Sequence, residues 1–161
     1  MGITLNADEI FEIAEQIERN GAKFYRRAAE KVSAAQQELL ELAAMEDDHE
    51  KNFAQMRKGL TSRQREQMVF DPDNQAALYL QAMASGHVFN LSQDLSEQLA
   101  GKDTAEDILR MAIEAEKDSI AYYTGMKDCV PVRAGKEKVE AIIREEMGHI
   151  ATLTEKLAEL K

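Results

Sequence analysis

Cysteine is almost absent from the sequence, because Cys129 is the only one among the 161 residues. A lone cysteine cannot close an internal disulfide and cannot supply a cluster of thiolate ligands. The sequence also lacks any apolar run near the roughly 20 residues of a membrane-spanning helix, and any N-terminal run typical of a signal peptide. These absences lead us to expect a cytoplasmic protein with no membrane partner.

Residues that break helices are also scarce, with two prolines and eight glycines. The chain is rich instead in alanine, glutamate, leucine, lysine and glutamine, which favour helix over strand. Positive charge is in deficit, since 20 lysines and arginines stand against 30 aspartates and glutamates, for a net charge of −10. This balance argues against nucleic acid or an anionic membrane as a partner, and it suits a cation-handling protein or simply a soluble one.

The apolar pattern predicts four long amphipathic helices within a single domain of residues 1–161. The expected ranges are about 6–31, 33–58, 103–128 and 136–160. The longer connection between the second and third contains a turn at 70–73 and a short helix at 74–84, with Leu78, Leu80 and Met83 as its apolar contacts. Two helical hairpins joined by a long crossover form an all-α four-helix bundle.

Local signals mark the ends of these segments. Asn6 with Glu9, and Ser33 with Gln36, have the spacing of capping boxes at the start of the first two helices. Gly135 lies in an interruption of the apolar pattern before the fourth helix, where it adds backbone freedom.

Each long segment has an inward-facing stripe whose positions alternate in steps of three and four. In residues 40–56, for example, the stripe includes Leu42, Phe53 and Met56, yet two of its central positions are a carboxylate and an imidazole. The polar members of the four stripes are Glu18 and Tyr25, Glu46 and His49, Glu116 and Tyr123, and Glu146 and His149.

The chain is a rough internal repeat. The pair Glu18 and Tyr25 recurs at an offset of 98, and the pair Glu46 and His49 recurs at an offset of 100. Each hairpin therefore contributes one glutamate and one Glu-x-x-His, about a pseudo-twofold axis. A water-facing helix side would explain any single glutamate, but the matched set of six favours a buried cluster.

Four ionised carboxylates cannot remain unpaired in a low-dielectric interior. They must be protonated, solvated or neutralised by a cation, and two divalent metal ions cancel four negative charges. Small residues beside the glutamates leave space for ligands and ions: Ala14, Gly21, Ala112 and Ser119.

Other polar residues have less specific patterns. Tyr25 and Tyr123 either pack in the core with their hydroxyl groups satisfied or support the neighbouring glutamates. His87 fits a capping or surface position, and a solvated helix face explains Glu15 and Glu114.

These residues resemble the ferritin-like superfamily, and its rubrerythrin-like branch in particular, along nearly the whole chain. The local matches are residues 18–25, Glu46-Asp-Asp-His49, residues 116–123 and Glu146-Met-Gly-His149. The resemblance implies terminal carboxylates at Glu18 and Glu116, bridging carboxylates at Glu46 and Glu146, and one metal on each of His49 and His149. Full-length rubrerythrins also carry a rubredoxin module with four cysteine ligands, which one cysteine cannot build.

Hard carboxylates with two imidazoles suit iron first, with manganese or zinc as alternatives. The leading hypothesis is a di-iron oxidoreductase that oxidises iron(II) with dioxygen or peroxide, or reduces peroxide with an external electron donor. A metal-binding or delivery protein without turnover, and a helical interaction module, are the alternatives. The resemblance also suggests a homodimer.

Overall fold

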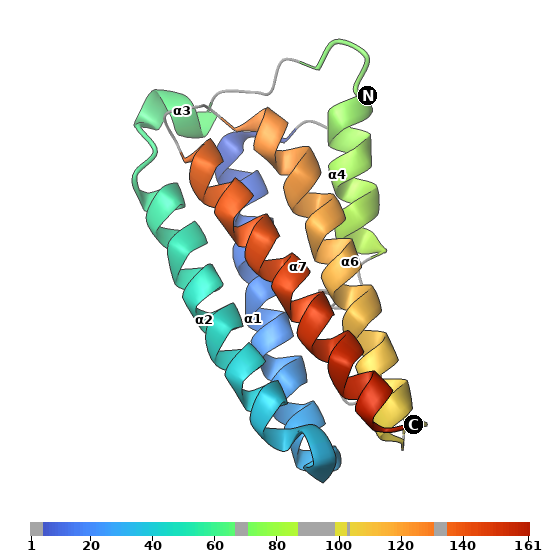
Figure 1. Ribbon diagram of the computed structural model, residues 1–161. Coiled ribbons are helices and arrows are strands. Elements are labelled where there is room, and N and C mark those ends of the chain that lie inside the picture. Colours follow the sequence, from blue (N-terminus) through green and yellow to red (C-terminus); the bar gives the residue numbers. More distant parts are fainter. Residues whose placement is uncertain (1–4, 67–70, 87–98, 103, 131–134) are drawn as a thin grey trace.

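Four long helices form the bundle in the computed structural model, which describes residues 5–66, 71–86, 99–102, 104–130 and 135–161 (Figure 1). They are α1 (Ala7–Lys31), α2 (Gln36–Lys58), α6 (Ala105–Cys129) and α7 (Lys136–Glu159). Helices α1 and α2 form one hairpin, and α6 and α7 form the other. The all-α bundle of two hairpins is therefore confirmed.

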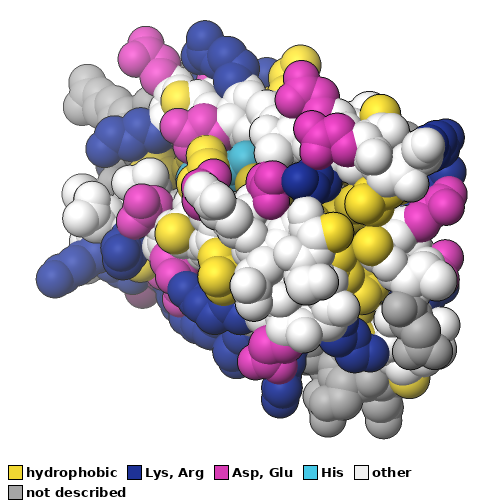
Figure 2. Space-filling model, turned by 60° about the horizontal axis from the view of Figure 1, so that its bottom comes forward, with side chains coloured by type: hydrophobic (Ala, Val, Ile, Leu, Met, Phe, Trp, Pro, Cys, Tyr) yellow, Lys and Arg dark blue, Asp and Glu magenta, His cyan; other side chains and the backbone are white. Residues whose placement is uncertain are grey.

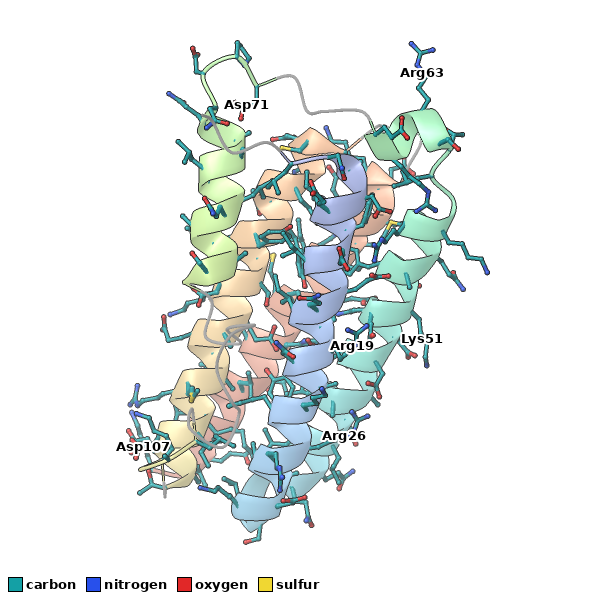
Figure 3. All side chains as sticks on the ribbon, turned by 180° about the vertical axis from the view of Figure 1, so that it is seen from behind. Arg19, Arg26, Lys51, Arg63, Asp71 and Asp107 are labelled. Atoms are coloured by element: carbon teal, nitrogen blue, oxygen red, sulfur yellow. The ribbon has the colours of Figure 1, made fainter. Side chains whose placement is uncertain are left out.

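The crossover between the hairpins contains α3 (Ser62–Glu66) and α4 (Gln75–Ser85). The short helix α4 was expected, whereas α3 was not, because five residues are too few to show helical periodicity. Asp71 lies beside the start of α4 (Figure 3), where its carboxylate accepts hydrogen bonds from the backbone N–H groups of Ala76 and Ala77. This carboxylate satisfies amide groups that have no partner within the helix.

Helix α4 packs against α6 through an aromatic contact (Figure 1). The Tyr79 ring lies over Gly125, where an added Cβ would be 2.4 Å from Tyr79 Cε1, and the Tyr79 hydroxyl donates to the carbonyl of Ala121 at 2.7 Å. Leu80 is buried as expected, but Leu78 is 49% exposed. The expectation of a buried Leu78 was wrong because Ala77 and Leu80 form the inner face of α4.

One of the two predicted capping boxes is present. Asn6 and Glu9 exchange backbone-to-side-chain hydrogen bonds of 2.9 Å at the start of α1. The box predicted from Ser33 was wrong, because residues Ser33–Ala35 form a separate 3-10 turn and α2 begins without a side-chain cap. Gly135 precedes α7 with φ of 108°, a left-handed conformation that favours glycine.

Two apolar clusters fill the bundle, one toward each end. Phe24, Leu39 and Leu109 are members of the first, and Phe11, Phe53 and Tyr122 are members of the second. The polar stripe residues at the middle of the long helices belong to neither cluster, apart from the two tyrosines. The core is therefore two apolar blocks with a polar layer between them.

Ion pairs join α1 to α2 on the outside of their hairpin. Arg19 lies 2.7 Å from Glu50, and Arg26 pairs with Asp47; both arginines extend from the visible side of α1 in Figure 3. Among the described residues, no helix combines the length and the apolar character that crossing a membrane requires.

Candidate metal centre

The polar layer contains all six residues that the sequence predicts as metal ligands. Each of the four long helices contributes a glutamate at its middle, and α2 and α7 add a histidine one turn later. All six side chains are buried, none being more than 2% exposed: Glu18, Glu46, His49, Glu116, Glu146 and His149. The helical stripes are therefore in register with one another.

The six residues form two overlapping groups. Glu18 and His49 belong to the first and Glu116 and His149 to the second, while Glu46 and Glu146 belong to both. One ligand-type atom from each of the four residues in a group lies within 4.8 Å of the others. This arrangement matches two ion positions that share two carboxylates.

The two imidazoles face the shared carboxylates from opposite helices. Nδ1 of His49 lies 3.1 Å from Glu146 Oε1 and 3.5 Å from Glu18 Oε2. Nδ1 of His149 lies 2.8 Å from Glu146 Oε2 and 3.1 Å from Glu46 Oε1. The histidine rings are stacked, with centroids 5.5 Å apart and an interplanar angle of 17°.

Burial and mutual repulsion favour protonation of the shared carboxylates. Burial, and then the charges of Glu146 and Glu18, raise the pKa of Glu46 well above its usual range. Burial, and then the charges of Glu116 and Glu18, raise the pKa of Glu146 in the same way. Without a cation, the layer therefore favours the protonated form of its central carboxylates.

The pKa values of the two imidazoles rise as well, because a cation among carboxylates is favoured. Burial lowers the pKa of His49, but its close contacts with Glu146 and Glu18 outweigh burial and raise the pKa to about 11. Burial also opposes the charged form of His149, yet contacts with Glu116 and Glu146 raise its pKa to about 9. The layer thus attracts positive charge, whether protons or metal ions supply it.

Two buried tyrosines bind the outer glutamates across the bundle. Tyr25 on α1 donates a hydrogen bond to Glu116 Oε1 on α6, and Tyr123 on α6 donates one to Glu18 Oε1 on α1. The exchange follows the pseudo-twofold repeat, because each tyrosine contacts the glutamate of the other hairpin. The two tyrosine rings pack in the apolar clusters with their hydroxyl groups satisfied, and the partners of those hydroxyl groups are the outer glutamates.

Two contacts of glutamates were not recognised from the sequence. Glu145 Oε2 on α7 lies 2.5 Å from Nε2 of His49, although the glutamate side chain is 53% exposed. Glu15 was expected on a solvated face, but it is buried and paired with Arg57 at 2.8 Å. Both contacts join residues of different helices, which no local spacing reveals. The one available signal concerns Glu145: the internal repeat pairs it with Met45, so the two halves differ at this position.

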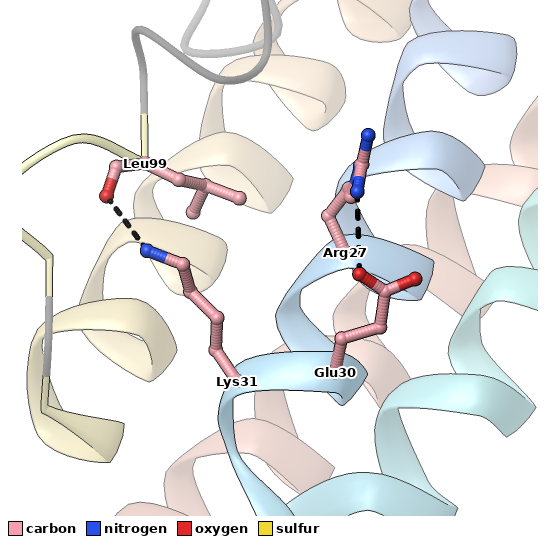
Figure 4. Close-up of a pocket in the computed structure, with 4 residues that line it drawn as sticks. All are labelled: Arg27, Glu30, Lys31 and Leu99. Carbon is pink, nitrogen blue, oxygen red and sulfur yellow. Dashed lines mark hydrogen bonds and ion pairs between the residues drawn. The ribbon is translucent and has the colours of Figure 1, made fainter.

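The remaining candidates are peripheral. Glu114 is exposed and pairs with Lys117, as a solvated face requires. His87 lies outside the described residues. A pocket of about 290 Å³ lined by Arg27, Glu30, Lys31 and Leu99 shares no residue with the layer (Figure 4).

Solvent reaches the edge of the layer at one face of the molecule. Figure 2 shows part of a histidine side chain between hydrophobic and acidic side chains. Since the described histidines are each only 2% exposed, this opening is narrow.

The layer fits metal ions by its unsatisfied atoms as well as by its residue types. Six buried atoms make no hydrogen bond with the described residues, although Nδ1 of His149 lies close to two of the carboxylate oxygens: Oε2 of Glu18, Glu116 and Glu146, Oε1 of Glu46, and both ring nitrogens of His149. Buried polar atoms are rarely left unpaired in proteins. Metal coordination would satisfy the carboxylate oxygens and one nitrogen of the imidazole.

A comparison with solved structures finds the same architecture. A crystal structure from Thermotoga maritima, provisionally described as a ferritin-like diiron-carboxylate protein, is 26% identical to the chain. The similarity covers 100% of both chains, with a TM-score of 0.79.

The chain has the ferritin-like fold. No protein-family model and no curated protein sequence matches it. The ferritin-like bundle and its buried carboxylate and histidine layer together support a site for two metal ions.

Proposed function

We propose that the protein is a di-iron carboxylate oxidoreductase. The observation that supports this most directly is the pair of four-residue groups sharing Glu46 and Glu146 in a layer with unpaired buried oxygens. Glu18 and His49 would hold one ion, and Glu116 and His149 would hold the other. The substrates would be iron(II) with dioxygen or peroxide, or peroxide with an external electron donor.

Iron suits this ligand set because it combines hard carboxylates with two imidazoles and contains no sulfur. Manganese and zinc can use the same ligands. When bound, a pair of iron(II) ions supplies two electrons to an oxidant. The apolar clusters above and below the layer limit the access of water, and Tyr25 and Tyr123 orient the outer glutamates.

The shared carboxylates provide the first test. Replacement of Glu46 by alanine removes a ligand of both ions. We therefore expect Glu46→Ala to lose the binding of two ions as a pair, because both positions are weakened. Metal analysis after anaerobic loading with iron(II) measures the stoichiometry per chain. Glu155→Ala, an exposed change near the end of α7, is the control. Retention of two irons per chain by Glu46→Ala would show that the ligand assignment is wrong.

Turnover needs a separate measurement. We expect iron(II)-loaded protein to develop the absorbance of oxidised iron rapidly when it is mixed with dioxygen or peroxide. A metal-binding or delivery protein is the second candidate, because the same two groups of buried ligands would serve it without turnover. Stoichiometric binding without rapid oxidation would favour that second function.

A further inference from the structure

The two halves of the layer differ in what lies behind their histidines. Glu145 contacts Nε2 of His49, while Nδ1 of the same ring faces Glu146 and Glu18. On the other side, Nε2 of His149 has no hydrogen-bond partner in the part of the chain that the structure describes. Among the described residues, only one of the two imidazoles therefore has a partner at Nε2.

The internal repeat identifies the residue that replaces Glu145 in the other half. An offset of 100 relates Glu46 to Glu146, and the same offset relates Met45 to Glu145. Met45 is 39% exposed on α2, directly before its shared glutamate. A thioether is only a weak acceptor, so it cannot replace a carboxylate beside an imidazole N–H.

The other supporting contacts obey the repeat. Tyr25 supports Glu116 and Tyr123 supports Glu18, so each ion position has one tyrosine behind its outer glutamate. The contact of Glu145 with His49 therefore stands out as a difference between two otherwise matched halves.

We propose that Glu145 is a positioning residue that makes the two metal positions unequal. Glu145 accepts a hydrogen bond from the Nε2–H of neutral His49. The Nδ1 lone pair of that ring then points at the metal position that Glu18 also lines. That position then binds a divalent ion before, and more tightly than, the position of Glu116 and His149. A carboxylate behind a metal-bound histidine fixes its tautomer and increases its basicity. The inference rests on the proposed metal site and adds an order of filling to it.

Exposure of Glu145 does not remove this effect. Ion pairs between two exposed groups contribute little to stability. Here, however, the imidazole is 2% exposed and only the glutamate side chain, at 53%, is exposed to water. Its position sets the direction of a buried ligand, so it should affect metal affinity more than the stability of the fold.

A cobalt(II) titration tests the proposal without redox chemistry. We expect wild-type protein to bind two ions in two steps. In Glu145→Met, which copies the residue of the other half, the tight step should weaken by about 10- to 100-fold and approach the weak one. Glu145→Gln, which keeps an acceptor oxygen, should lose less. Glu155→Met, a matched change on an exposed part of α7, should change neither step.

The reciprocal variant keeps the test valid even if Glu145→Met folds poorly. Met45→Glu places a carboxylate behind His149 and should tighten the weak step. Met147→Glu adds the same charge at another exposed position beside a shared glutamate, and it should not tighten that step. An equal gain in both variants would contradict positioning and indicate simple charge attraction.

A spectroscopic measurement separates positioning from a general structural effect. In zinc-loaded protein labelled with 15N, His49 should show a protonated, slowly exchanging Nε2, and Glu145→Met should lose that protection. The corresponding proton of His149 should exchange faster in wild type and slow down in Met45→Glu.

The outcomes distinguish the two proposals. A wild-type protein that binds two ions with one affinity, or a Glu145→Met variant with an unchanged tight step, would overturn the unequal positions and leave the proposed metal site intact. A folded wild-type protein that binds no cobalt(II), iron(II) or zinc(II) would contradict the metal site itself.

Discussion

A glutamate with no exposed surface needs partners for both oxygens, and among the described residues Glu18 and Glu116 each have a hydrogen-bond partner for only one. Tyrosine hydroxyl groups bind the Oε1 atoms, while the Oε2 atoms remain unpaired among the described residues. Such half-satisfied carboxylates are costly in an apolar interior, so the missing partners are the strongest residue-level argument for a cation.

Removal of one tyrosine hydroxyl should weaken metal binding. In Tyr25→Phe, Glu116 loses its only hydrogen bond among those described, and we expect the affinity of the corresponding ion to fall about 10-fold, at the low end for such supporting groups. Tyr123→Phe should affect the other ion similarly. The measurement is a cobalt(II) titration of each variant.

Tyr122→Phe is the matched control. The Tyr122 hydroxyl donates to the carbonyl of Ile10 at 3.0 Å, so its loss should cost about 0.5–1.5 kcal/mol of unfolding free energy and leave metal affinity unchanged. Equal metal affinity in Tyr25→Phe and wild type would show that the hydroxyl group does not support the ligand.

Metal binding should release protons. Burial and neighbouring carboxylates raise the pKa of Glu46 and Glu146, and the surrounding carboxylates raise the pKa of His49 to about 11 despite burial. These shifts favour the protonated groups, His49 at pH 7 among them, and a metal ion must displace those protons, so affinity should fall as the pH decreases. Calorimetric titration in buffers of different ionisation enthalpy counts the protons. Binding without proton release would contradict this charge state.

At the scale of helices, periodicity explains which residues face inward, and side-chain contacts explain where the short elements lie. Every stripe position predicted on α2, from Leu42 to Met56, is buried. Helix α3 and the 3-10 turn at Ser33–Ala35 were not predicted, because a single helical turn has no repeating apolar pattern. The docking of α4 depends on Gly125 of α6, which lies beneath the ring of Tyr79.

Gly125→Ala should loosen α4. The new Cβ would lie 2.4 Å from Tyr79 Cε1, so the ring must move and its hydrogen bond to Ala121 is disturbed. We expect a loss of about 1–2 kcal/mol in unfolding free energy, together with faster hydrogen exchange of the α4 amides. Denaturant unfolding and exchange mass spectrometry measure the two effects.

Gly148→Ala is the opposite case on α7. An added Cβ there meets no atom within 4 Å, and alanine favours helix over glycine by about 0.5–1 kcal/mol. We therefore expect a small stabilisation and unchanged exchange in α4. Similar effects of the two alanines would show that the contact with Tyr79 does not limit the docking of α4.

Across the whole molecule, the polar layer interrupts what would otherwise be one continuous apolar core. Two apolar clusters lie on either side of it, and the layer gathers residues from all four long helices. A cation bound there would join both hairpins. Metal binding should therefore be coupled to the stability of the entire bundle.

Loading with metal should raise the melting temperature. An ion that binds only the folded protein stabilises it by about 2.7 kcal/mol when its free concentration is 100 times its dissociation constant. We expect iron(II) or manganese(II) to raise the melting temperature of wild type and a chelator to reverse the shift. Thermal unfolding followed by circular dichroism measures this. Glu46→Ala should respond much less, and a wild-type melting temperature indifferent to metal would favour a helical interaction module.

Much of this architecture could be predicted because helical periodicity is a local property. Spacings of three and four placed Glu46 with His49, and Glu146 with His149, on inward faces. The repeat then brought them level with Glu18 and Glu116. The contacts of Glu145 and Glu15 could not be predicted, because an exposed carboxylate and one that reaches another helix look alike in a chain rich in glutamate.

The sequence by itself determined that four helices would each bury a carboxylate at mid-length. The spacing of apolar and polar residues within one helix is a local property, and it decides which side chains face inward. The resemblance also implied that Glu46 and Glu146 are shared. Only the tertiary structure decided that each tyrosine crosses to the opposite hairpin, and that, among the described residues, His49 has a partner at Nε2 while His149 does not. These relations depend on the relative rotation and height of packed helices, which no local spacing specifies.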